Sequence, residues 1–285
     1  MSLVIGEISY TNILPIFYYL NRERLNDLGC SFVPKVPAEL NDGMEKGEVD
    51  VGGISSFSFG ENWKDYELLP NLSISSPKNV RSIFLFSKVP ITQLDNKSIA
   101  LTSSSATSVN LLKILLKKFY SLNNTYETLS PNYDQMMKSH DACLLIGDDA
   151  IRTKKHASSD IHCYDLGSLW AQFTHLPMTY AVFAVRKEAL KNNSQVIEEL
   201  YRQFQVSKQA SIKNEFKDVI HSIQKNMGGT TQFWKEYFQG LNYDLTNKHI
   251  ESLRLYFDIA NELGLLNEKV EEIKLWNPSE FCQSV

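Results

Sequence analysis

The sequence predicts an α/β protein with two lobes and a helical C-terminal segment. Three observations predict this fold class. Short apolar strands alternate with helical patterns over the first 90 residues, a second set of the same kind follows up to about residue 177, and the chain from residue 187 onward is helical. The length of 285 residues suits two domains, which typically hold roughly 100–200 residues each.

The first lobe is predicted from its β-α-β-α-β order. The expected elements are a strand at 3–5, a helix at 12–22 with Pro15 in its first turn, a strand at 32–34, a helix at 38–46 and a strand at 49–54. Such an order favours a parallel, doubly wound sheet with right-handed connections. Ligands of these sheets collect at the carboxyl ends of the strands, so the residues after each strand are the candidates for a site.

A second, inserted lobe follows a further apolar strand at 82–87. Its expected elements are a strand at 98–102, a helix at 108–120, a strand at 142–146 and a helix near Asp149. We expect a strand at 180–185 to pair with 82–87 and to lead the chain back. The predicted lobes are therefore residues 1–88 with 178–285, and residues 89–177. Two lobes joined by two crossings describe the type II periplasmic-binding-protein architecture, with a ligand in the cleft.

Composition and charge exclude several functional classes. A net charge of −4 provides no field to hold a nucleic acid or an anionic membrane. No segment has the basic start of a signal peptide or the ~18 apolar residues of a membrane span, so we expect a cytoplasmic protein. Dinucleotide, P-loop, zinc and nucleophile-elbow motifs are absent from the sequence, and we expect no metal and no cofactor. Composition leaves monomer and homodimer open.

The segment Thr102–Ser108 is the most suggestive chemically. Six of its seven residues carry hydroxyl groups, where a strand ends and a helix begins. Free backbone N–H groups and the helix dipole favour an anion there, and the candidates are Ser105, Thr107 and Ser108. Plain capping of the helix by Ser105 or Thr107 is the alternative.

Three more turns follow predicted strands and carry polar candidates. Ser55 and Ser56 form a second hydroxyl turn in the other lobe, so that two anion-binding turns would suit a ligand with two carboxylates. In the segment Tyr10-Thr11-Asn12, the Asn12 amide either caps the following helix or points into the cleft. Gly147-Asp148 brings a carboxylate to the same edge, as a cap or as a ligand contact.

Seven strings, in order over about residues 4–186, resemble the chorismate dehydratases of menaquinone biosynthesis. They are ISYTN with LP at 8–15, GEVDV to SS at 47–56, LPNLSIS at 69–75, VRSI at 80–83, ALT to SATS at 100–108, LLIGD at 144–148, and YDLG with Trp170 at 164–170. The resemblance implies the two-lobe binding-protein fold. It also implies the first step of the futalosine route, in which chorismate loses water to give 3-[(1-carboxyvinyl)oxy]benzoate. Asn12 and Ser82 fall on the family's active-site positions.

Two departures from the family's pattern and two rival functions accompany this resemblance. Glu7 stands where a basic residue is common, and His175 where glycine is expected. The sister enzyme of the pathway, 1,4-dihydroxy-6-naphthoate synthase, has the same fold but relies on a catalytic histidine and a different N-terminal motif. A non-catalytic solute-binding or sensor protein of the same fold is the other alternative.

The predicted turns contain no obvious strong base. We therefore hypothesise that the side-chain carboxylate of chorismate removes the ring proton, while Asn12 and Ser82 orient the substrate and polarise the ring. Closure of the two lobes would exclude water and strengthen these contacts.

Overall fold

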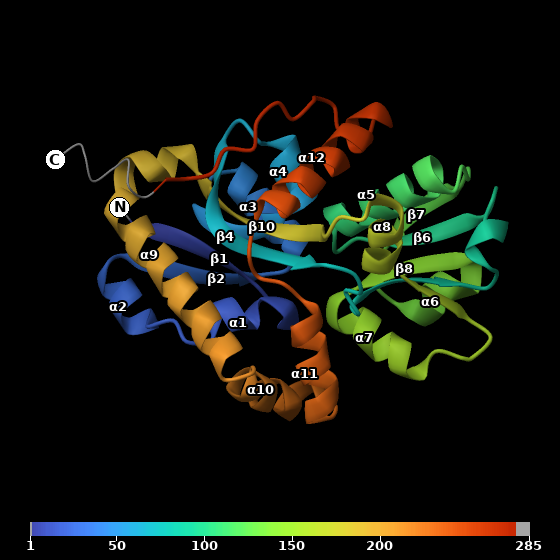
Figure 1. The fold of residues 1–285 in the computed structure, drawn as a ribbon, viewed down its shortest axis with the longest axis horizontal. Coiled ribbons are helices and arrows are strands. Elements are labelled where there is room, and N and C mark those ends of the chain that lie inside the picture. The colour runs from blue at the N-terminus through green and yellow to red at the C-terminus, as the bar shows by residue number, and fades with distance from the viewer. Residues whose placement is uncertain (1, 278–285) are drawn as a thin grey trace.

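The fold consists of two five-stranded sheets, one in each lobe (Figure 1). It is taken from a computed structural model of the chain, and the structure describes residues 2–277. The strand order is β2-β1-β3-β10-β4 in the first sheet and β7-β6-β8-β5-β9 in the second. The two-lobe α/β fold class predicted from the sequence is confirmed.

The first sheet is mixed rather than wholly parallel. Its central strand β3 pairs parallel with β1 and antiparallel with β10, which pairs antiparallel with β4 in turn. The strands are β1 (Leu3–Ile8), β2 (Cys30–Lys35), β3 (Val51–Ser55), β4 (Tyr66–Ser76) and β10 (Met178–Arg186). The helical elements are η1 (Thr11–Ile13), α1 (Leu14–Phe17), α2 (Arg22–Asp27), α3 (Pro37–Glu45) and α4 (Ser56–Glu61). The single helix expected at 12–22 is therefore two shorter elements, η1 and α1, followed by a non-helical stretch before α2 begins at Arg22.

The second sheet has the same mixed character. In it β6 pairs parallel with β7 and β8, whereas β5 pairs antiparallel with β8 and β9. The strands are β5 (Ile83–Ser87), β6 (Ser98–Thr102), β7 (Thr125–Leu129), β8 (Ala142–Ile146) and β9 (His162–Asp165). The helical elements are η2 (Ile91–Gln93), α5 (Ala106–Ile114), the π-helical turn η3 (Leu115–Phe119), α6 (Tyr133–Ser139), α7 (Gly147–His156) and α8 (Leu166–Thr174).

The expected pairing of 82–87 with 180–185 is wrong. β5 lies between β8 and β9 in the second sheet, whereas β10 lies between β3 and β4 in the first. Both are continuous apolar runs, and a run buried on both faces has no alternation to specify its partner. The lobe division at 1–88 with 178–285, and 89–177, stays a prediction. Because β5 belongs to the second sheet, we propose that the first boundary between the two lobes lies within residues 77–82. The tail at 278–285 lies outside the described residues.

The C-terminal helices pack mainly on the first lobe (Figure 1). They are α9 (Lys187–Lys213), α10 (Lys217–Met227), α11 (Thr231–Gly240) and α12 (Asn247–Glu262). Phe204 of α9 packs edge-on against Phe17 at 5.1 Å and Phe183 at 5.4 Å between ring centroids. Such aromatic contacts add to the burial that fixes an amphipathic helix on a sheet.

No helix within residues 2–277 is long and apolar enough to span a membrane. Within the same residues, His, Cys, Asp and Glu side chains form no group of three that could hold a metal ion.

Candidate functional site

A cavity lies where residues of both lobes meet. The space between its lining atoms is about 530 Å³, including the part that opens to solvent. The lining consists of Ile8, Tyr10, Asn12, Pro37, Ser55, Ile74, Val80, Ser82, Ile83, Ser105, Ser108, Ile146, Gly147, Tyr180 and Ala181. The structure thus brings together most of the predicted site residues.

Apart from Ser82, which directly precedes β5, and Tyr180 within β10, the polar part of this lining follows the carboxyl ends of strands. Tyr10 and Asn12 follow β1, Ser55 ends β3, Ser105 follows β6, and Gly147 follows β8. The rule for open α/β sheets therefore located these turns from the sequence.

Ser55 is both a helix cap and a cavity residue. Its Oγ accepts the Ser58 N–H at 3.0 Å and an Asn41 Nδ2–H at 3.2 Å. With both lone pairs occupied, the hydroxyl proton of Ser55 is left to donate to a ligand in the cavity.

Ser105 and Ser108 form a second oriented pair. Ser105 caps α5 by accepting the Ser108 N–H at 3.1 Å, and its Oγ donates to Ser108 Oγ at 3.0 Å. Ser108 therefore accepts a bond and keeps its own proton for a cavity ligand. The cap expected from the sequence is present, and both serines also line the cavity.

Asn12 does not cap a helix. The cap position of η1 belongs to Tyr10 and shows no side-chain bond. The Oδ1 atom of Asn12 is buried and has no hydrogen-bond partner among residues 2–277, while the residue lines the cavity. An unpaired buried acceptor is costly unless another donor satisfies it, which makes Asn12 the strongest candidate in the cavity for a ligand contact.

Ser82 is held at its backbone from both sides. Its carbonyl accepts the Gly147 N–H at 2.7 Å. The preceding residue, Arg81, adopts a left-handed conformation with φ 60°. Asp165 fixes this turn by accepting the N–H groups of Val80 at 3.1 Å and Arg81 at 2.7 Å. Burial raises the pKa of Asp165, and these N–H groups act in the opposite direction.

Tyr10 crosses from the first lobe onto the second. Gly147 has φ 57°, and a Cβ there would lie 3.3 Å from the Tyr10 ring, so glycine permits both the turn and the close packing. Burial raises the pKa of Tyr10, with a hydrogen bond to Ser104 acting in the opposite direction. A second hollow, the outer groove, adjoins the cavity, and its lining includes Glu7, Thr11, Asp148 and Met227. Tyr10 and Ile8 line both hollows.

Thr11 and Asp148 lie in that outer groove rather than in the cavity lining. Burial raises the pKa of Asp148, and a hydrogen bond with Thr11 opposes this shift. The pair therefore joins η1 of the first lobe to α7 of the second.

Ser56 and Thr107, predicted as substrate contacts, are also outside the cavity lining. Ser56 Oγ donates to the Thr179 carbonyl at 2.8 Å, and Thr107 Oγ1 accepts the Phe57 N–H at 3.0 Å. Both hydroxyls thus make internal bonds, and neither faces the cavity.

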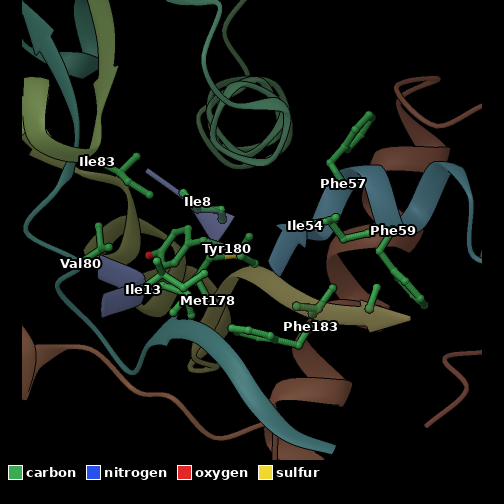
Figure 2. Packing of buried hydrophobic residues seen from close by; sticks show 14 of the residues in the cluster. Ile8, Ile13, Ile54, Phe57, Phe59, Val80, Ile83, Met178, Tyr180 and Phe183 are labelled. Atoms are coloured by element: carbon green, nitrogen blue, oxygen red, sulfur yellow. The ribbon is translucent and has the colours of Figure 1, made fainter. Parts of the chain in front are cut away.

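Sequence reasoning missed the apolar part of the lining. This part comes from three segments of the chain, which contribute Ile8, Tyr180, and Val80 with Ile83, and these side chains lie close together beside the core (Figure 2). Tyr180 is fully buried, its hydroxyl is 3.0 Å from Ser76 Oγ, and burial raises its pKa well above the usual value. These residues read as ordinary core positions in a sequence, because nothing local marks a core side chain that also faces a cavity.

The two departures from the family's pattern lie outside the cavity lining. His175 is exposed and ends α8 with φ 59°, a left-handed conformation that favours glycine. Glu7 accepts two bonds from Arg22 Nη2 at 2.9 Å and borders the outer groove.

Neither a charged side chain nor a histidine is among the described residues that line the cavity. Its polar groups are hydroxyls, the Asn12 amide and the first turns of α5 and α7. Hydrogen-bond donors of this kind suit an anion, and the apolar walls suit a ring.

Sequence comparison identifies the family. A family model described as menaquinone biosynthesis matches residues 3–262. The chain belongs to this menaquinone-biosynthesis family. Among its relatives, the chorismate dehydratase of Thermus thermophilus is 35% identical over 205 residues, which cover 65% of this chain and 70% of the relative. The chorismate dehydratase of Campylobacter jejuni is 28% identical, over 66% of this chain and 70% of the relative.

Solved structures place this member of the menaquinone-biosynthesis family in the periplasmic-binding-protein fold. A protein from Archaeoglobus fulgidus has a TM-score of 0.74 at 18% identity, covering 93% of this chain and 98% of that one. The periplasmic aliphatic sulphonate binding protein of Escherichia coli has a TM-score of 0.69 at 15% identity, covering 97% and 92%. At these identities the likeness concerns the fold alone.

Proposed function

We propose that this protein is a chorismate dehydratase, a carbon–oxygen lyase that converts chorismate to 3-[(1-carboxyvinyl)oxy]benzoate. The observation that carries the proposal is the 35% identity to the Thermus thermophilus chorismate dehydratase. The cavity supports it, because hydroxyl and amide donors beside apolar walls suit a cyclic substrate with two carboxylates.

The reaction removes a ring proton and the neighbouring hydroxyl group. The electrons of the broken C–H bond form the new ring double bond, the C–O bond breaks, and the departing hydroxide takes up a proton to leave as water. Aromatisation of the ring drives the elimination. The protein's task is then to hold the carboxylates and to polarise the ring.

The base is proposed to be the substrate's own side-chain carboxylate. The only titratable side chains among the described lining residues are Tyr10 and Tyr180, and burial raises the pKa of both. A phenol that keeps its proton is a donor rather than a base. Asn12 and Ser82 would orient the substrate so that its carboxylate reaches the ring proton.

The two rival functions have less support. A catalytic histidine like that of the sister enzyme has no counterpart in the described cavity lining, and His175 is exposed at the end of α8. A sensor of the same fold would bind chorismate without converting it, which makes turnover the discriminating property.

The test is to incubate the purified protein with chorismate and to follow the products by mass spectrometry. We expect a product that has lost one water and co-elutes with 3-[(1-carboxyvinyl)oxy]benzoate. Chorismate without protein controls for spontaneous decay, and Asn12→Ala prepared identically controls for contaminating enzymes. Chorismate that binds but returns unchanged would favour the sensor.

A further inference from the structure

The cavity hydroxyl of Ser82 has a buried neighbour to which the sequence assigns no role in the site. Tyr237 lies in α11, outside the cavity lining, and its hydroxyl donates to Ser82 Oγ at 3.3 Å. Its ring is 1% exposed and is fixed by edge-on contacts with Trp234 at 5.7 Å and Phe238 at 5.3 Å between centroids.

The direction of this hydrogen bond determines what Ser82 can do. The geometry of the contact makes the Tyr237 hydroxyl the donor and Ser82 Oγ the acceptor. Burial raises the pKa of Tyr237 above its usual value, so the phenol keeps the proton that it donates. Ser82 then accepts from Tyr237, and its single proton must go elsewhere. Within the described structure the available acceptor is the Val80 carbonyl at 3.4 Å, a long and weak contact.

A ligand carboxylate in the cavity would be a better acceptor than the Val80 carbonyl. A bond from a hydroxyl to a charged acceptor is shorter and about twice as strong as one between neutral groups. The chain from Tyr237 through Ser82 to the ligand would also polarise in one direction, which strengthens each member.

The backbone around Ser82 supports the same arrangement. The Arg81 guanidinium bonds Glu236 at 3.0 Å, so two consecutive residues contact two consecutive residues of α11. Asp165 and Gly147 fix the backbone on either side. With the backbone fixed, only the Ser82 side chain can still rotate, and its orientation depends on the hydrogen bond from Tyr237.

We propose that Tyr237 is a positioning residue that fixes Ser82 as a hydrogen-bond donor to the substrate. This inference rests on the proposed function only in naming the substrate. Tyr237 does not touch the ligand and acts entirely through Ser82.

The test is a double-mutant cycle with Tyr237→Phe and Ser82→Ala. Tyr237→Phe should lower kcat about tenfold, as expected for groups that orient a contact residue, with less than a twofold change in KM. In the Ser82→Ala background the same substitution should have no further effect on kcat, because the residue through which it acts is gone. Equal losses in both backgrounds would overturn the proposal and assign Tyr237 a purely structural role.

Tyr243→Phe is the matched control. Tyr243 is another buried tyrosine of the same region, and its hydroxyl has no hydrogen-bond partner among residues 2–277. This variant should keep the kcat of the wild type, and thermal unfolding would verify that both phenylalanine variants are folded. An equal fall in kcat for Tyr243→Phe would overturn the proposal.

A crystal structure of Tyr237→Phe gives a readout that needs no turnover. We expect the Ser82 side chain to rotate so that the present 3.4 Å contact between its Oγ and the Val80 carbonyl becomes shorter, and an unchanged rotamer would contradict the proposal. A wild-type protein that fails to dehydrate chorismate would refute the proposed function, and the rotamer would still decide the role of Tyr237.

Discussion

At the scale of single residues, the cavity is a set of hydroxyls oriented by their own neighbours. Ser55 and Ser108 each accept internal hydrogen bonds that leave the hydroxyl proton for a ligand. The unpaired Asn12 Oδ1 is an acceptor and suits a ligand hydroxyl, whereas the Nδ2 group of the same amide can donate to a carboxylate. An anion can thus be held in a cavity without a lysine or an arginine in its described lining.

His175 provides a residue-scale prediction that separates stability from activity. Its left-handed φ of 59° at the end of α8 is strained for any residue with a Cβ. His175→Gly should raise the free energy of unfolding by about 0.5–1 kcal/mol, measured by urea denaturation. His175→Ala keeps the strain and should give no such gain.

Both His175 variants should keep wild-type turnover, because the side chain is exposed and is assigned no proton transfer. The pH profile of kcat should then lack a histidine limb near pH ~6.5. If turnover were abolished in His175→Ala with binding retained, the mechanism would need a histidine base.

At the scale of elements, the sequence predicted strands better than their partners. The strands expected at 98–102 and 142–146 are β6 and β8 with the same bounds. The β4 strand was missed as an element, and β5 was assigned to the wrong sheet, because partners far apart in sequence leave no local signal. The site turns were predictable from strand ends. The contributions of Tyr237, Tyr180 and Asp165 could not be predicted, because they depend on tertiary packing.

Helix α9 carries an element-scale prediction in Glu199. The Arg202 guanidinium, one turn on, lowers the pKa of Glu199 from 4.5 to about 2, helped by Gln203 and Arg24. A folded-state pKa below the unfolded value means stabilisation that is complete above about pH 4.5 and is lost as the pH falls toward 2.

Glu199→Gln should therefore lower the free energy of unfolding by about 1 kcal/mol at neutral pH, since exposed arginines are screened by solvent. Urea unfolding at a series of pH values should show the difference vanish in the acid range. Glu198→Gln, the adjacent carboxylate on α9, is the control. A difference that persisted undiminished in acid would contradict the assignment.

At the scale of the whole molecule, the lobes meet through hydrogen bonds as well as through the cavity. The Phe57 N–H of α4 donates to Thr107 Oγ1 of α5 at 3.0 Å, and the Thr107 carbonyl accepts from Tyr256 at 3.1 Å. Thr107 therefore joins the first lobe and α12 to the second lobe. A hydroxyl-rich turn in the sequence thus contains one residue that holds the lobes together and two that face the cavity.

Because Thr107 joins the lobes and Ser108 lines the cavity, substitutions at these two residues should affect different quantities. Thr107→Val leaves the Phe57 N–H unpaired and should destabilise the free protein by about 1–2 kcal/mol, with the chorismate-induced stabilisation largely kept. Thr107→Ser retains the acceptor and is the control. Ser108→Ala should instead reduce the ligand-induced stabilisation by about 1–3 kcal/mol. Thermal unfolding with and without chorismate measures both, and an unchanged ligand effect in Ser108→Ala would show that this residue serves only the helix start.

The most direct measurement of the central claim compares binding and turnover of chorismate in Asn12→Ala and Ser82→Ala. If these residues orient a substrate that supplies its own base, both variants should still bind chorismate by calorimetry. Their kcat should fall by about 10²-fold or more, because a positioning or charge-stabilising contact is lost. Variants that bind chorismate and dehydrate it at the wild-type rate would contradict the account.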